Sequence, residues 1–146
     1  MIPELVNISH SPWDVLPHGI HVASLAEVNA KFSTTSHREW LFDGFCRAVS
    51  NLQQAGCSII YLDGSFVTAK THPDDFDGIW DPMGVDPNKL DPVLLDFDNK
   101  RAAQKAKYGG ELFISTHQAV HGVSYLDFFQ NDRYSGQNKG ILSIQI

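Results

Sequence analysis

The stretch that decides the fold is SIIYLDGSFVTAKTHPDDFDGIW, residues 58–80. Its first five residues, 58–62, are mostly apolar and β-prone, and they end at Asp63-Gly64-Ser65. This pattern predicts a buried strand that runs into a turn. A second short strand is expected at residues 76–80, directly after Asp75. The stretch therefore predicts two strands, with a Gly-Ser turn after the first and acidic residues at the start of the second.

Two helices are expected before this stretch. Ser24-Leu-Ala-Glu27 is a capping box, in which the hydroxyl and the carboxylate satisfy free amide groups at a helix start, and it predicts a short helix ending near Phe32. Ser36-His-Arg-Glu39 repeats this pattern. Apolar residues then recur at steps of three or four up to Gly56, which is placed for a left-handed C-terminal cap. They are Leu41, Phe45, Ala48, Leu52 and Ala55.

Turns, helices and strands follow in the remaining chain. Asp-Pro pairs begin at positions 81, 86 and 91, and they indicate turns and helix starts, because Asp caps helices and Pro suits their first position. A helix is expected at 99–108, ending at Gly109-Gly110. A strand at 111–115, a short helix at 124–130 and an alternating terminal strand at 142–146 complete the prediction.

These elements predict an α+β fold, a mixed α/β sheet with helices packed on it. The chain of 146 residues is long enough for one core and too short for two ordinary domains, so we expect a single domain over residues 1–146. Residues 1–21 have no sustained period. We expect them to lie as an arm over the domain, partly docked through Trp13.

Charge and composition narrow the function classes. The formal net charge of −6 argues against a protein that wraps nucleic acid through a broad basic face. No stretch approaches the roughly 20 apolar residues of a membrane span, and the start of the chain lacks a basic leader. We therefore expect a cytoplasmic protein without membrane contact, whose two cysteines are reduced thiols.

The acidic residues are segregated. Nine of the 17 fall between positions 63 and 98, and such a cluster indicates either an exposed loop or a metal site. Asp75 and Asp77 are two residues apart at the start of the second strand, so both side chains point to the same face. Two converging carboxylates suit Mg²⁺. A solvated turn after His72-Pro73 explains the same pair without a metal.

The order of these features resembles the nucleotidyltransferase superfamily of the polymerase-β type. A strand ends in Gly64-Ser65, and eleven residues after Gly64 a second strand begins with Asp75-Phe-Asp77. The resemblance implies that Gly64 and Ser65 hold a nucleoside triphosphate (NTP) and that Asp75 and Asp77 hold Mg²⁺. It also implies a third carboxylate on a later strand, for which Glu111 fits because it follows the helix at 99–108. Asp96 competes for this role but precedes that helix.

Further motifs resemble a family of small bacterial proteins of unassigned function with this nucleotidyltransferase-like core. They are YLDGSFVT (61–68), KAKYGGELF (105–113), FFQNDR (128–133) and KGI (139–141). Families of this kind are often associated with toxin–antitoxin or phage-defence loci, which implies a setting and no particular reaction. The sequence departs from the superfamily in carrying Glu at position 111 and Gly78 directly after the second carboxylate. Both departures leave the acids in place, and the extra methylene of Glu111 would shift a metal ligand.

The resemblance implies a mechanism with two Mg²⁺ ions bridged by Asp75 and Asp77, and with Glu111 on the acceptor side. One or more cations of the helix would offset charge on the departing pyrophosphate. The candidates are Lys105, Lys107 and Arg101, and a solvated helix face is the alternative for them.

Two function classes remain open. The first is a Mg²⁺-dependent enzyme that transfers a nucleoside monophosphate from an NTP to a hydroxyl of a protein, RNA or small molecule, with RNA entering only as acceptor. The second is a non-catalytic, antitoxin-like binding module that retains the core as a scaffold. Because 146 residues leave little room for an acceptor-binding domain, a partner protein or a homo-oligomer would have to supply it. Zinc binding by His18 and His21 with His117 and His121 is a weaker alternative, since the second pair is expected in a loop.

Overall fold

The computed structural model describes all residues, 1–146, and contains one five-stranded mixed sheet. The strand order is β1-β7-β2-β3-β4, with β1 at Gly19–Val22, β7 at Gly140–Gln145, β2 at Ile59–Asp63, β3 at Phe76–Trp80 and β4 at Gly110–Ile114. The pairs β1·β7 and β3·β4 are parallel, and β2 is antiparallel to both of its neighbours. This arrangement confirms the predicted α+β class.

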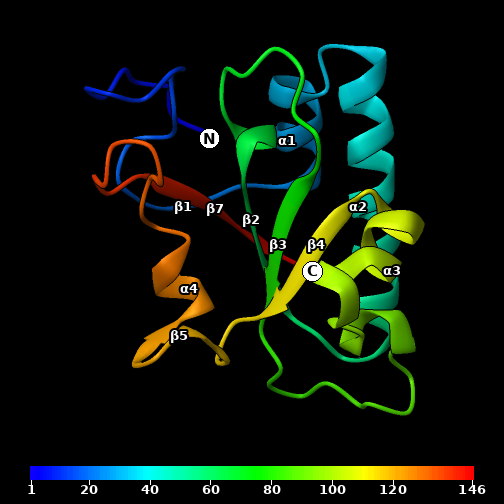
Figure 1. Cartoon of the computed structure of the whole chain (residues 1–146). Helices are drawn as coiled ribbons and strands as arrows, with labels where there is room; N and C mark the ends of the chain where they lie inside the picture. The colour runs from blue at the N-terminus through cyan, green and yellow to red at the C-terminus, as the bar shows by residue number, and fades with distance from the viewer.

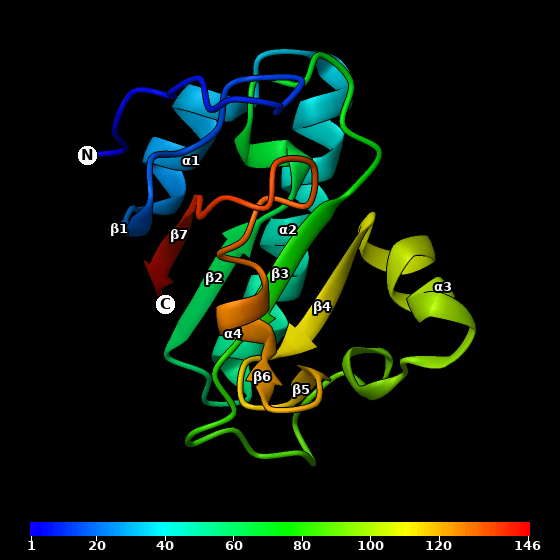
Figure 2. The ribbon, with the colours of Figure 1, turned by 60° about the vertical axis from the view of Figure 1, so that its left-hand side comes forward.

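Helices cover one face of the sheet. They are α1 (Leu25–Phe32), α2 (Ser36–Gln54) and α3 (Asp98–Tyr108). A short helix, α4 (Tyr125–Phe128), and the hairpin of β5 (Gln118–Val120) and β6 (Val123–Ser124) lie on the other side (Figure 1). In Figure 2, α4 lies in front of β2 and β3, while α2 lies behind these two strands. The two faces of the sheet therefore have very different surroundings.

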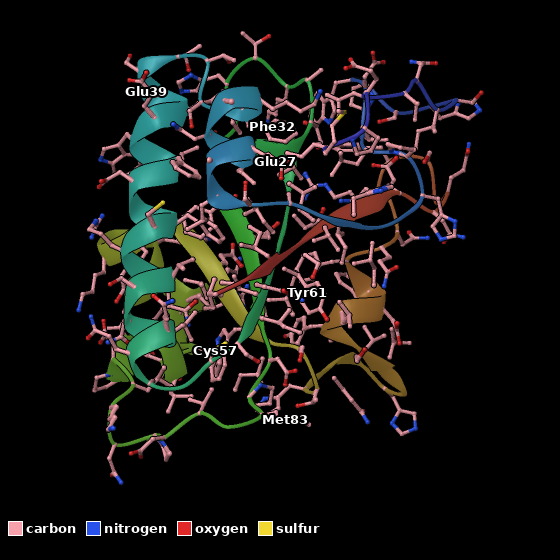
Figure 3. All side chains as sticks on the ribbon, turned by 180° about the vertical axis from the view of Figure 1, so that it is seen from behind. Glu27, Phe32, Glu39, Cys57, Tyr61 and Met83 are labelled. Atoms are coloured by element: carbon pink, nitrogen blue, oxygen red, sulfur yellow. The ribbon has the colours of Figure 1, made fainter.

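The core lies between the sheet and α1 and α2. All five periodic apolar residues of the second expected helix are buried, as the spacing predicted. Phe45 on α2 packs edge-to-face on Phe76 of β3, with ring centroids 5.3 Å apart. Figure 3, seen from behind, shows α1 and α2 side by side over the sheet, with Phe32 on α1 and Cys57 in the connection from α2 to β2. Because Phe76 points to α2, its neighbours in β3 point to the opposite face.

Local signals in the sequence hold in most places. Ser24 and Glu27 form both hydrogen bonds of the capping box. The N-cap of α2 lies one residue earlier than predicted: the hydroxyl of Thr35, and not that of Ser36, accepts a hydrogen bond from the backbone N–H of Arg38. Each Asp of the three Asp-Pro pairs accepts a hydrogen bond from the backbone N–H two residues later, as expected of turn and cap residues.

Two expectations need correction. Residues 1–21 are not all an arm, since Gly19–Val22 form the edge strand β1, parallel to β7. The helix expected at 99–108 is interrupted at its start, because Asn99, Lys100 and Arg101 have positive φ angles of 52°, 56° and 62°. Left-handed backbone costs non-glycine residues about 1–2 kcal/mol each, so the helix propensity of this stretch was a poor guide there. No helix of the chain is both long and apolar enough to cross a membrane.

Candidate functional site

Three carboxylates occupy paired positions on the neighbouring strands β2, β3 and β4. Asp63, the last residue of β2, is in register with Asp77 of β3, and Asp77 is in register with Glu111 of β4. Residues that are paired across a sheet point to the same face. Asp75 precedes Asp77 by two residues and shares this face. The four acids therefore gather on the side of the sheet that faces α4, away from the helices of the core. We call them the acid row.

Two members of the acid row are paired with cations. Lys139 donates a hydrogen bond to Oδ1 of Asp63, whose side chain is only 1% exposed. Glu111 accepts from Nε of Arg101 at 2.5 Å and lies 3.0 Å from Nζ of Lys105. Each pair joins a strand to a residue outside the sheet, which fixes the direction of the carboxylate.

The other two members have no partner within the chain. Neither Asp75 nor Asp77 forms an ion pair, and neither carboxylate accepts a hydrogen bond. Both side chains are half-buried. Two partly buried carboxylates without donors are costly, because desolvation and mutual repulsion both disfavour the ionised form.

The pKa values of the acid row reflect this cost. Burial raises the pKa of Asp77 well above its usual range, and the charges of Asp75, Asp63 and Glu111 raise it further. Burial also raises the pKa of Asp75, again with a contribution from Glu111. For Asp63 burial raises the pKa, and the ammonium of Lys139 opposes the shift. Perturbed carboxylates in a cleft are typical of functional sites.

The turn at Gly64-Ser65 lies directly against Asp77. Gly64 has φ 85° and ψ −174°, a region that is essentially restricted to glycine. A Cβ at Gly64 would lie 2.7 Å from Oδ2 of Asp77, so only glycine leaves room for this carboxylate. The hydroxyl of Ser65 is half-exposed beside it and makes no hydrogen bond within the protein. The turn thus combines a glycine that lies against Asp77 with a serine hydroxyl that has no partner within the protein.

A buried arginine anchors the segment that follows the turn. Arg38 of α2 is 4% exposed and donates to the backbone carbonyls of Phe66, Thr68 and Lys70 at 2.6, 3.0 and 2.5 Å, and to that of Phe32 at 3.3 Å. Desolvation lowers its pKa. The guanidinium has no carboxylate partner, and three of its four hydrogen bonds hold the backbone of residues 66–70 in place.

The acid row forms the floor of a cleft of about 810 Å³. At one end, the wall is aromatic and apolar and includes Phe113, Tyr125 and Phe128, with Phe113 and Tyr125 ring centroids 4.5 Å apart. At the other end, Trp13 of the N-terminal arm meets Tyr134 edge-to-face at 5.3 Å. The cleft thus combines an acidic floor with aromatic side chains whose faces can stack on a planar ring system.

The cleft contains most of the residues that the sequence singled out. Its lining includes Gly64, Ser65, Asp75, Asp77, Arg101 and Glu111. Lys105 does not line the cleft and reaches it only through Glu111.

Two candidates lie elsewhere. The ammonium of Lys107 pairs with Asp91, away from the cleft, because residues two apart on a helix face different directions. Asp96, the competitor of Glu111, also lies outside the cleft and accepts a hydrogen bond from the backbone N–H of Asp98.

Several residues of the cleft were missed by sequence reasoning. The sequence predicts Asp63 only as part of the turn and of the acidic cluster, although its place at the end of β2 could have suggested register with Asp77. Lys139 is 76 positions from its partner Asp63, and no local pattern signals such a pair. Arg133 lines the cleft without any carboxylate partner, and its pKa is raised mainly by its contact with Tyr134 and further by Asp77 and Asp75.

A divalent cation fits part of this arrangement. No three His, Cys, Asp or Glu side chains converge closely enough to enclose a metal ion by themselves. Mg²⁺ rarely uses such a cage and is usually held by one or two carboxylates together with waters and substrate phosphates. The donor set fits that mode: Asp75 and Asp77 are free carboxylates, and the fully buried Oδ2 of Asp63 beside them has no hydrogen-bond partner.

Fold and site together define a mixed-sheet α+β protein with an acidic cleft on the open face of its sheet. Residues 9–145 match the family described as a family of unknown function, DUF6932, and the chain belongs to this family. No curated protein and no solved structure matches the chain. The expectation that the chain belongs to a family of unassigned function is confirmed.

Proposed function

We propose that this protein is a Mg²⁺-dependent nucleotidyltransferase, which transfers a nucleoside monophosphate from an NTP to a hydroxyl of a protein, an RNA or a small molecule. One observation carries the proposal. The two carboxylates without partners, Asp75 and Asp77, lie beside the Gly64-Ser65 turn at the floor of a cleft that is large enough for a nucleotide. The order of these features along the chain supports the same conclusion.

When bound, Mg²⁺ supplies charge neutralisation of the phosphates and lowers the pKa of the acceptor hydroxyl. Asp75 and Asp77 hold the ion. The hydroxyl of Ser65 donates to the phosphate chain. Arg133, which has no carboxylate to neutralise it, offsets charge on the departing pyrophosphate.

The reaction is an in-line displacement at the α-phosphorus. The acceptor oxygen forms a bond to phosphorus, the bond to the bridging oxygen breaks, and pyrophosphate leaves with the electron pair. Glu111 lies at the edge of the acid row and receives the proton of the acceptor hydroxyl. The aromatic wall at Phe113, Tyr125 and Phe128 stacks on the nucleobase.

A second candidate is a non-catalytic binding module that keeps this core as a scaffold. It is favoured by one observation: Glu111 is already held by Arg101 and Lys105, and so is not free to complete a metal site. Against it stands the cost of keeping Asp75 and Asp77 without partners, which a scaffold could avoid by substituting either one.

Label transfer separates the two candidates. Wild-type protein and the Asp75→Asn, Asp77→Asn double variant are incubated with each α-labelled NTP and Mg²⁺ in cell lysate, and label is followed into protein and RNA. Asp43→Asn is the matched control, because Asp43 is an exposed acid on α2, far from the acid row in the fold. We expect transfer by the wild type and by Asp43→Asn, and none by the double variant. If no protein transfers label and calorimetry shows no Mg²⁺-dependent NTP binding, the enzymatic proposal is wrong.

A further inference from the structure

The pair formed by Lys139 and Asp63 is a fixed part of the site floor. The Asp63 side chain is buried, with 1% exposure, and that of Lys139 is mostly covered, with 11% exposure. Lys139 directly precedes β7, the neighbour of β2 in the sheet, and its backbone N–H donates to the carbonyl of Gln130 at 2.9 Å. The next residue, Gly140, donates to the carbonyl of Leu16 at 3.0 Å. Backbone contacts on both sides therefore hold the ammonium against the acid row.

The charges of the acid row do not leave room for two divalent ions. Lys139 neutralises Asp63, while Arg101 and Lys105 neutralise Glu111. Asp75 and Asp77 are the two members of the acid row without a paired cation, and their two negative charges match those of one divalent ion. A second ion would have to bind among carboxylates that already have their counter-charges, close to Lys139, Arg101 and Lys105.

We propose that the Lys139 ammonium takes the place of a second metal ion, so that the site binds a single divalent cation through Asp75 and Asp77. This inference rests on the proposed function and deepens it. Lys139 is a positioning residue: it fixes Asp63, and it supplies a permanent positive charge next to Asp77. The unpartnered Oδ2 of Asp63 is the atom that a second ion would use if Lys139 were absent.

The test counts bound ions directly. Mn²⁺ replaces Mg²⁺, and electron paramagnetic resonance measures the number of bound ions per chain. The titration uses Mn²⁺ alone and then Mn²⁺ with α,β-methylene ATP, which cannot be cleaved at the α-phosphorus. Two ions in one site lie about 3.5–4 Å apart and give a spin-coupled spectrum, whereas one ion gives an uncoupled spectrum.

Four proteins are compared. Wild type and Lys139→Arg, which keeps the positive charge, are expected to bind one uncoupled ion. Lys139→Met frees Asp63 and is expected to bind two coupled ions. Lys139→Met combined with Asp63→Asn removes both charges of the pair and is expected to return to one ion. This last variant shows whether the second ion of Lys139→Met binds through Asp63. If Lys139→Met alone does not fold, the ion count of the wild type still decides between one ion and two.

The outcomes are distinct. Two coupled ions in the wild type overturn this inference and leave the proposed function in place. A single ion in folded Lys139→Met also overturns it, because Asp63 would then not be the second site. If no protein binds Mn²⁺ even with the nucleotide analogue, both the inference and the Mg²⁺-dependent function are wrong.

Discussion

Replacing Asp77 with Asn is expected to stabilise the protein in the absence of metal. Sheet neighbours lie about 5 Å apart, and two unit charges at this distance repel by about 3 kcal/mol at an effective dielectric constant of about 20. Lys139 beside Asp63 and Arg101 beside Glu111 cancel part of this repulsion. A net gain of about 1–2 kcal/mol remains, which corresponds to a rise in Tm of about 3–6 °C for a chain of this size.

The effect should depend on pH in a defined direction. The pKa of Asp77 is raised in the folded state, so folding favours its protonated form. The destabilisation is therefore absent below the unfolded pKa of about 3.9 and grows as pH rises through the folded pKa. We expect Asp77→Asn to exceed the wild type in Tm at pH 8 and to match it near pH 4.

Added Mg²⁺ should reverse the order of the two proteins. A ligand at 100 times its Kd stabilises the folded state by about 2.7 kcal/mol, and only the wild type keeps both carboxylates that hold the ion. Thermal melts with EDTA and with saturating Mg²⁺ measure both effects, with Asp43→Asn as a control that should follow the wild type throughout. A Tm of Asp77→Asn at or below that of the wild type at pH 8 in EDTA would refute the idea that the acid row is repulsive. Equal Mg²⁺ shifts in both proteins would refute metal binding by Asp77.

Three further variants test other parts of the site. Gly64→Ala puts an alanine into a backbone conformation that only glycine adopts easily, and it places a Cβ against the Asp77 carboxylate. We therefore expect about 2–3 kcal/mol of destabilisation in urea melts and loss of label transfer. The control Gly122→Ala, with φ 79° and open space around it, should destabilise the protein by about 1 kcal/mol. Phe128→Ala should weaken ATP binding by about 5- to 150-fold, equivalent to about 1–3 kcal/mol of stacking, without changing tripolyphosphate binding in calorimetry. The control Phe97→Ala, outside the cleft, should change the affinity for neither ligand. Equal losses of affinity for both ligands in Phe128→Ala would contradict base stacking. Arg38→Met removes the hydrogen-bond donor to four backbone carbonyls and should lower the free energy of unfolding by about 3 kcal/mol. The control Arg47→Met, at an exposed position, should lower it by about 1 kcal/mol or less in the same melts. A small effect of Arg38→Met would show that the backbone of residues 66–70 does not depend on the guanidinium.

The central part of the fold could be predicted because its signals are local. The alternation of two in a strand places Asp75 and Asp77 on one face, and the helical period of 36–55 places its apolar side on the sheet. Once β2, β3 and β4 are known to be neighbours, their register brings Asp63 and Glu111 beside Asp77. The sequence predicted the three strands and placed Glu111 at the start of the last of them. The pairing of β2 with β3 is known only from the structure.

The remaining parts depend on contacts between distant residues. β1 is a strand only because β7, the last element of the chain, offers it a parallel partner, and nothing within residues 19–22 signals this. The left-handed backbone at 99–101 contradicts the local helix propensity, and it brings Arg101 to Glu111. Which lysine of α3 pairs with the acid row depends on the helix orientation, which places Lys105 near Glu111 and Lys107 at Asp91.

The cations around Glu111 connect the two candidate functions. Arg101 and Lys105 form ion pairs with Glu111 in the structure. This arrangement is the one expected of the non-catalytic binding module. A nucleoside triphosphate brings about four negative charges, which compete with Glu111 for Arg101, the one of these two cations that lines the cleft. Under the proposed function, the arrival of the substrate thus weakens the hold on Glu111 at the moment when a base beside Asp77 is needed. The paired state of Glu111 is therefore compatible with an enzyme whose site is completed by its own substrate, and the two unpaired carboxylates next to it have no comparable explanation in a scaffold.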